Sequence, residues 1–198
     1  MLTDSELVAI WNAAPASDYG RIIKLLMLTG QRRDEIASLR WSEIDGDALT
    51  LPAERTKNAR PHIVPSSPQA RGVLDETPER VGQTHVFGCG KTGYNNFSRA
   101  KERLDEASGV QGWVVHDLRR TVATRMADLG VQPHVIEAVL NHVSGHKAGV
   151  AGIYNRSSYS VEKRAALDLW GSHIQTVLAQ ADGANVALLR KPALGGVA

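Results

Sequence analysis

The sequence has 198 residues, and its 42% hydrophobic and 22% charged content is typical of a globular chain that buries a core, not of a disordered one. A formal net charge of +2 permits nucleic acid as a partner without arguing for it, so that case depends on where the arginines lie. The apolar runs are too short to cross a membrane, and acidic residues near Met1 argue against a secretory signal. The single cysteine, Cys89, excludes an internal disulfide and fits a reducing cytoplasm.

The first half of the chain predicts helices around a small sheet. Thr3 and Glu6 have the spacing of a capping box, and Gly30 supplies a helix stop. After the third helix, an Asp-Gly turn and β-type residues predict two extended runs joined by a polar hairpin tip. The expected helices cover residues 6–14, 19–30, 32–41 and 66–76, and the extended runs cover residues 45–52 and 60–65.

The second half is predicted to be helical apart from one short strand at residues 84–87. Its expected helices cover residues 95–108, 116–130, 132–142 and 160–180. Residues 181–198 are rich in glycine and small side chains, which predicts a flexible tail. We therefore expect a mainly α domain with a small antiparallel β-sheet, an α+β class, over residues 1–180.

The first candidate site residue is Arg32, at the start of the third predicted helix. An arginine is unfavourable next to the positive end of a helix dipole, and an arginine in that position is often placed to meet an anion. Glu35 follows three residues later, on the same helical face, and can hold Arg32 in place. The alternative is that Arg32 and Arg33 are solvated surface charges.

The second candidate is Lys57, at the polar tip between the two extended runs, flanked by Asn58 and Arg60. A mobile tip suits a lysine that reaches into a groove once a substrate is bound. A solvated turn lysine is the alternative.

The third candidate pair is His116 and Arg119, which share one face at the start of a helix. A histidine can move a proton while a guanidinium neutralises developing negative charge, a combination that suits a phosphodiester. The alternative is a capping histidine beside a surface arginine.

The fourth stretch carries His142, which follows an apolar helix end, and Tyr154, twelve positions later. Tyr154 could instead be a partly buried aromatic residue, and Tyr159 is its nearest rival as a reactive phenol. His142 and His146 have a spacing that can bind zinc, but Gly145 lies between them and no third ligand is near. We therefore expect no metal and no cofactor.

These stretches, in this order, resemble the tyrosine recombinase family, also called phage integrases. The motifs that carry the resemblance are Thr29–Glu35 ("TGQRRDE"), Lys57 before "HIVP", His116–Arg119 ("HDLR"), "LNH" ending at His142, and Tyr154 in "GVAGIYNR". The likeness extends over residues 2–180, and the last two motifs look most like the prophage-type branch. Asn141 replaces the commoner glycine of the family, and "VPSS" replaces the usual "VPLS".

The resemblance implies a DNA strand transferase that needs no metal. Tyr154 would be the nucleophile, and Arg32, Arg119 and His142 would bind the non-bridging oxygens of the phosphate. Lys57 would protonate the leaving 5′-oxygen and His116 would assist proton transfer at the tyrosine. Glu35, a supporting residue, would orient Arg32.

The implied partners are a double-stranded DNA attachment site, three further copies in a homotetramer, and DNA-bending accessory proteins, in the cytoplasm of a bacterium beside the nucleoid. Full-length relatives carry an N-terminal core-binding domain, which we expect to be absent from this chain. Two alternatives stay open: a non-catalytic DNA-binding prophage remnant, and an enzyme like the type IB topoisomerases.

The last predicted helix has an apolar stripe, which we assign to Ala165, Leu169, Trp170 and Ile174. The stripe could cover the domain's own core. The resemblance implies instead that this segment passes to a neighbouring protomer on DNA.

Overall fold

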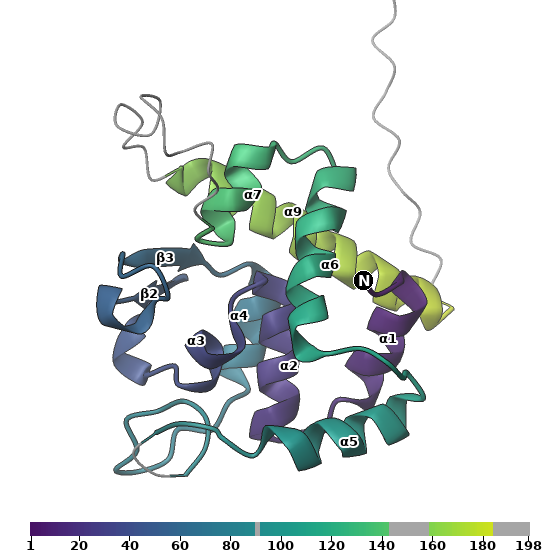
Figure 1. Cartoon of the computed structure of the whole chain (residues 1–198), viewed down its shortest axis with the longest axis horizontal. Coiled ribbons are helices and arrows are strands. Elements are labelled where there is room, and N and C mark those ends of the chain that lie inside the picture. Colours follow the sequence, from purple (N-terminus) through teal and green to yellow (C-terminus); the bar gives the residue numbers. More distant parts are fainter. Residues whose placement is uncertain (90–91, 143–158, 184–198) are drawn as a thin grey trace, which may run out of the picture.

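The computed structural model describes residues 1–89, 92–142 and 159–183, which form one helical body with a small sheet at its side (Figure 1). The helices are α1 (Asp4–Ala13), α2 (Asp18–Thr29), α3 (Arg33–Ala37), α4 (Pro68–Asp75), α5 (Phe97–Ser108), α6 (Val115–Asp128), α7 (Pro133–Val139) and α9 (Ser160–Ala181). Two short 3-10 turns are η1 (Trp41–Glu43) and η2 (Ala53–Arg55). The strands are β1 (Ile44–Asp45), β2 (Ala48–Leu51) and β3 (His62–Pro65).

Helix α2 lies at the centre of the core, because nine of its twelve residues are buried. Its buried apolar side chains include Ile22, Ile23, Leu25, Leu26, Met27 and Leu28. Its charged residues Asp18, Arg21 and Lys24 are only partly exposed, and its apolar sides contact α3, α4, α6 and α9. Two predicted helix ends are confirmed, since Thr3 begins α1 with a capping box and Gly30 ends α2 with a φ of 65°.

The sheet is antiparallel, with strand order β1-β2-β3. Leu51 pairs with His62 at one end of the β2–β3 ladder and Ala48 pairs with Pro65 at the other. The predicted mainly α fold with a small antiparallel sheet is therefore confirmed. Residues 52–61 connect β2 to β3 and carry Lys57, as expected.

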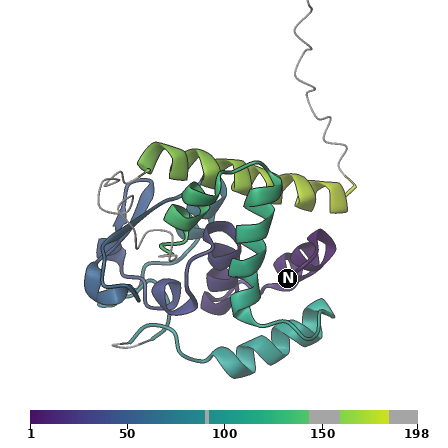
Figure 2. The same cartoon turned by 45° about the horizontal axis from the view of Figure 1, so that its top comes forward.

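Helix α9 lies across one side of the body, over elements from both halves of the chain (Figure 2). Its Trp170 is fully buried and donates its Nε1 hydrogen to the Met27 carbonyl of α2 at 2.8 Å. The buried Lys163 donates to the Ile63 carbonyl of β3. This helix therefore covers the core of its own chain.

Part of the stripe predicted on α9 is wrong. Trp170 and Ile174 are buried, but Ala165 and Leu169 face solvent. The buried face of α9 runs instead through Lys163, Ala166, Leu167, Trp170, Gly171 and Ile174. The prediction missed Lys163 because a lysine is polar by type, whereas its ammonium finds a strand carbonyl only in the folded chain.

Three further element predictions need correction. Helix α3 ends at Ala37, because Arg55 donates to the Glu35 carbonyl at 2.8 Å and the Tyr94 amide donates to the Ala37 carbonyl at 2.9 Å. These bonds satisfy carbonyls that a longer helix would use. Residues 84–87 form no strand; they make only an isolated bridge between His85 and Arg40.

The third correction concerns α7, which ends at Val139, before "LNH", instead of at residue 142. Asn141 has a φ of 48°, so the chain leaves the helical conformation there. Within the described residues, no helix is both long and apolar enough to cross a membrane.

His62 ties the sheet to α7 and makes the stability of the fold depend on pH. Its buried Nε2 lies 3.0 Å from the Val139 carbonyl, so this nitrogen donates the hydrogen. Burial first, and then the charge of Lys163, lower the pKa of His62 to about 4 from 6.5. Between these pH values the unfolded chain takes up a proton that the folded chain does not, so the free energy of unfolding falls as the pH falls.

We predict that His62→Gln flattens this dependence, because a glutamine amide can still donate to Val139 but does not titrate. The wild type should lose on the order of 3 kcal/mol more than the variant as the pH falls through this window. Urea unfolding at a series of pH values measures the difference. Parallel stability curves for the two proteins would contradict it.

Candidate active site

Four of the six predicted catalytic residues line one open pocket of about 550 Å³. The pocket is bounded by the start of α3, the β2–β3 connection, α5 and the start of α6. The predicted residues among its lining are Arg32, Lys57, His116 and Arg119. Two guanidinium groups, one ammonium and one imidazole from distant parts of the sequence are thus brought to one surface.

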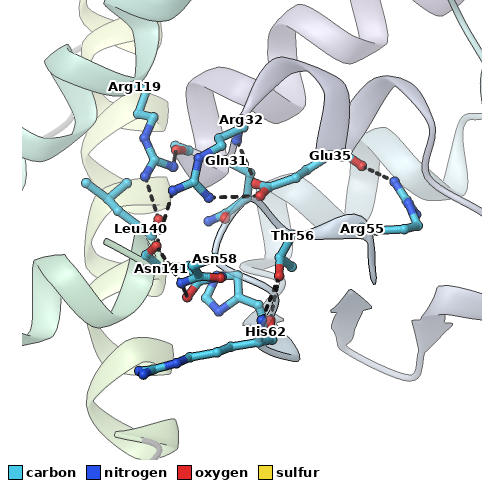
Figure 3. A network of polar contacts seen from close by, with 12 residues as sticks. Gln31, Arg32, Glu35, Arg55, Thr56, Asn58, His62, Arg119, Leu140 and Asn141 are labelled. Atoms are coloured by element: carbon cyan, nitrogen blue, oxygen red, sulfur yellow. Dashed lines mark hydrogen bonds and ion pairs between the residues drawn. The ribbon is translucent and has the colours of Figure 1, made fainter. Parts of the chain in front are cut away.

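Arg119 is buried, with 8% of its surface exposed, although it carries a charge. Its Nη1 donates to the Gly30 carbonyl at 2.8 Å and its Nη2 donates to the Leu140 carbonyl (Figure 3). Gly30 and Leu140 are the C-terminal caps of α2 and α7. Carbonyls at helix C-termini lack intrahelical partners and carry partial negative charge, so they stabilise a buried guanidinium. The alternative that Arg119 is a surface charge is wrong.

Arg32 lies beside Arg119 and is held from two sides (Figure 3). Its Nη1 forms an ion pair with Glu35 Oε1 at 2.9 Å, and its Nη2 donates to the Asn141 carbonyl at 3.2 Å. Glu35 is 3% exposed and also accepts the Arg32 backbone hydrogen at 3.0 Å. The predicted contact between Glu35 and Arg32 is confirmed, and 22% of the Arg32 side chain stays exposed.

The two arginines leave the pocket electropositive. Burial first, and then the charge of Arg32, lower the pKa of Arg119 to about 10, at which it is still protonated at neutral pH. The two neighbouring guanidinium groups repel each other, and a bound anion would relieve that repulsion. The arrangement is therefore suited to a phosphate that interacts with both guanidinium groups.

His116 lies in the first turn of α6, at the rim of the pocket. Partial burial first, and then the charges of Arg119 and Arg120, lower its pKa below the ordinary value. A lowered pKa keeps the imidazole neutral at neutral pH, so it can accept a proton. Its position and charge state fit the predicted part in proton transfer, which stays a prediction.

Lys57 is exposed on the pocket, but the residues beside it are anchored. On one side, Arg55 bonds to Glu43, to the Glu35 carbonyl at 2.8 Å and to Ser38 Oγ at 2.9 Å. The start of the predicted tip is therefore tied to the end of α3 through the Arg55 side chain. The sequence offered no signal for Arg55, because its partners come from a distant segment.

His142 is exposed and directly follows Leu140 and Asn141, the two residues whose carbonyls hold the arginines. Its own amide donates to the Glu137 carbonyl at 2.9 Å. Tyr154 and His146 lie outside the described residues. No group of three or more potential metal ligands occurs in the described part of the chain.

The other wall of the pocket was not predicted. Lys101 lies 3.9 Å from the ring centroid of Trp113, and Arg33 lies 4.8 Å from that of Phe97. Both cations line the same pocket as the arginine pair, and each also forms an ion pair, Lys101 with Asp105 and Arg33 with Asp34. Lys101 sits on the fifth predicted helix, and no feature of the sequence distinguishes it from a solvated helical lysine.

A family model described as "Phage integrase family" matches residues 1–160. The chain belongs to this family. The resemblance and the recombinase catalytic fold inferred from the motifs are thereby confirmed. The prophage integrase IntZ of Escherichia coli K12 is 32% identical over 186 residues, which cover 88% of the chain and 45% of IntZ. The integrase chain thus spans less than half the length of this relative.

Two solved structures have the same fold. A lambda integrase dimer bound to a COC′ core site has a TM-score of 0.58 at 23% identity, covering 72% of this chain and 57% of that one. A lambda integrase tetramer bound to a Holliday junction has a TM-score of 0.58 at 22% identity, covering 80% and 48%. At these identities the likeness establishes the integrase fold.

Both the backbone conformation at position 30 and the side chains around it favour glycine there. A Cβ on Gly30 would lie 2.9 Å from side-chain atoms of Val122 and Leu140, and its φ is 65°. Gly109, which ends α5, has a φ of 71° with open space around it. The two glycines therefore share the backbone strain that a side chain would meet, but only Gly30 also has a close approach.

We predict that Gly30→Ala lowers the free energy of unfolding by about 1–3 kcal/mol more than Gly109→Ala, the cost of forcing a methyl group into a packed site. The urea midpoints of both variants against the wild type measure this. Equal losses would show that conformational strain alone fixes the glycine.

Proposed function

We propose that residues 1–180 are the catalytic domain of a site-specific DNA recombinase, which cleaves and rejoins strands through a 3′-phosphotyrosyl link. The observation that carries the proposal is the placement of Arg32 and Arg119 in one pocket with Lys57 and His116. Family membership supports it, as does the similarity to prophage integrase IntZ.

In the proposed reaction, the Tyr154 oxygen attacks the scissile phosphorus and the bond to the 5′-oxygen breaks. The Arg32 and Arg119 guanidinium groups and His142 stabilise the charge that builds on the non-bridging oxygens. Lys57 gives its proton to the leaving 5′-oxygen, and His116 takes the tyrosine proton. The phosphotyrosyl bond preserves the energy of the phosphodiester, so a second 5′-hydroxyl can reverse the step.

The proposed partner is a double-stranded DNA attachment site, and the proposed assembly is a homotetramer on two paired sites. The lambda integrase structures on a core site and on a Holliday junction support both points. A chain that acts on bacterial DNA in this way would associate with the nucleoid. The DNA-bending accessory proteins would act on the same sites.

The decisive test is capture of a covalent adduct. We would incubate the chain in EDTA with a pool of short duplexes that carry a randomised core and a nick beside the scissile phosphate, so that cleavage releases a fragment and traps the intermediate. We predict a protein–DNA adduct on a denaturing gel for the wild type and none for Tyr154→Phe, because the variant lacks the attacking oxygen.

Tyr159→Phe is the matched control, because Tyr159 is the nearest other phenol in the sequence. An adduct that survives Tyr154→Phe but not Tyr159→Phe would move the nucleophile. DNA binding without an adduct in any form of the protein would favour the non-catalytic remnant. An adduct formed without assembly on paired sites would favour a topoisomerase-like activity.

A further inference from the structure

The loop that carries Lys57 is joined to the segment that carries His142 by a pair of asparagine side chains (Figure 3). Asn58 Nδ2 donates to Asn141 Oδ1 at 2.7 Å, and Asn141 Nδ2 donates back to Asn58 Oδ1 at 3.2 Å. Both residues are partly buried. Two reciprocal hydrogen bonds between the side-chain amides fix the relative orientation of the two segments, which a single hydrogen bond would leave free to rotate.

Asn141 is suited to this role by its backbone as well as its side chain. Its φ of 48° lies in the left-handed region, which asparagine tolerates better than most residues. The glycine that is commoner in the family would adopt the same backbone but could not form the amide pair. The Asn141 carbonyl also accepts from Arg32 Nη2, so one residue contacts both the arginine and the lysine loop.

Lys57 is thus held from both sides. Arg55 bonds the preceding stretch to the Glu35 carbonyl of α3, and Asn58 bonds the following stretch to Asn141. Between them the buried Thr56 closes the loop, because its Oγ1 bonds to the Arg60 carbonyl at 2.7 Å. The backbone around Lys57 is therefore held relative to Arg32, while the exposed lysine side chain lines the open pocket.

We propose that the Asn58–Asn141 pair is a clamp that positions Lys57 to protonate the leaving 5′-oxygen, which makes both asparagines positioning residues. The proposal rests on the proposed recombinase function. In that step the Tyr154 oxygen–phosphorus bond forms, the phosphorus–5′-oxygen bond breaks, and the proton passes from the Lys57 ammonium to the 5′-oxygen. A loosened loop would slow that proton transfer and leave charge stabilisation by the arginines intact.

The leaving group offers a way to test the clamp. A thiol is far more acidic than an alcohol, so a 5′-sulfur leaves as a thiolate without a proton donor. Replacing the bridging 5′-oxygen with sulfur therefore removes the need for the proton donor Lys57, but not the need for the other catalytic residues. A variant that acts through the lysine should recover on the sulfur substrate, whereas one that acts through the arginines or the fold should not.

The variants are Asn58→Ala, Asn141→Gly and the double variant, with Asn12→Ala, on the exposed face of α1, as the matched control. Asn141→Gly keeps the left-handed backbone and removes only the side chain. The DNA is the duplex enriched by wild-type adduct capture, made with either a 5′-oxygen or a 5′-bridging sulfur. Single-turnover cleavage rates are measured on both substrates.

We expect each single variant to cleave the oxygen substrate about 10- to 100-fold more slowly than the wild type, the range for a misplaced catalytic group. The double variant should be no slower than either single variant, because each removes the same pair. On the sulfur substrate all three should match the wild type, as should Asn12→Ala on both substrates.

Unchanged rates on the oxygen substrate would overturn the clamp, and so would slow cleavage that sulfur does not restore. The wild-type adduct is read first, so failure of the clamp can be told apart from failure of the recombinase function. A wild type that forms no adduct removes the reaction that both need, whereas a wild type that cleaves beside unaffected variants refutes the clamp and leaves the recombinase function standing.

Discussion

The site depends on one constraint: two guanidinium groups of like charge are held side by side by backbone carbonyls. Arg119 donates to the caps of α2 and α7, and Arg32 donates to the residue that follows the α7 cap. These helix ends must therefore meet beneath α6. Gly30 permits that meeting, since its left-handed backbone ends α2 where a side chain would collide with Val122 and Leu140.

The same carbonyls explain why the pocket is prepared for an anion. Burial removes water from Arg119, and Glu35 neutralises only part of the local charge, so a phosphate would complete an arrangement that the protein leaves positive. The lysine loop is joined to this frame through Arg55 and Asn58. The geometry of the site is thereby set by hydrogen bonds, which run from the arginines to backbone carbonyls and between the side-chain amides of Asn58 and Asn141.

Local signals in the sequence predicted the fold well wherever neighbours in the chain decide the structure. Thr3 with Glu6, Gly30, and Glu35 three residues after Arg32 are such cases. Tertiary contacts decided the rest: Arg55 shortens α3, Lys163 is buried under β3, and His62 bonds to α7. Asn141 lies between these cases, because the motif marked it as unusual but only the structure reveals its partner.

The central claim is that the arginine pair stabilises the charge of a scissile phosphate. The most direct measurement compares single-turnover cleavage by the wild type and Arg32→Ala on ordinary DNA and on DNA with a neutral methylphosphonate at the scissile position. On ordinary DNA the variant should lose about 100-fold or more. On the methylphosphonate that loss should be much smaller, because its transition state carries one negative charge fewer than that of the phosphodiester and leaves less charge for Arg32 to neutralise. The same loss on both substrates would contradict the account, since Arg32 would then act on something other than the phosphate charge.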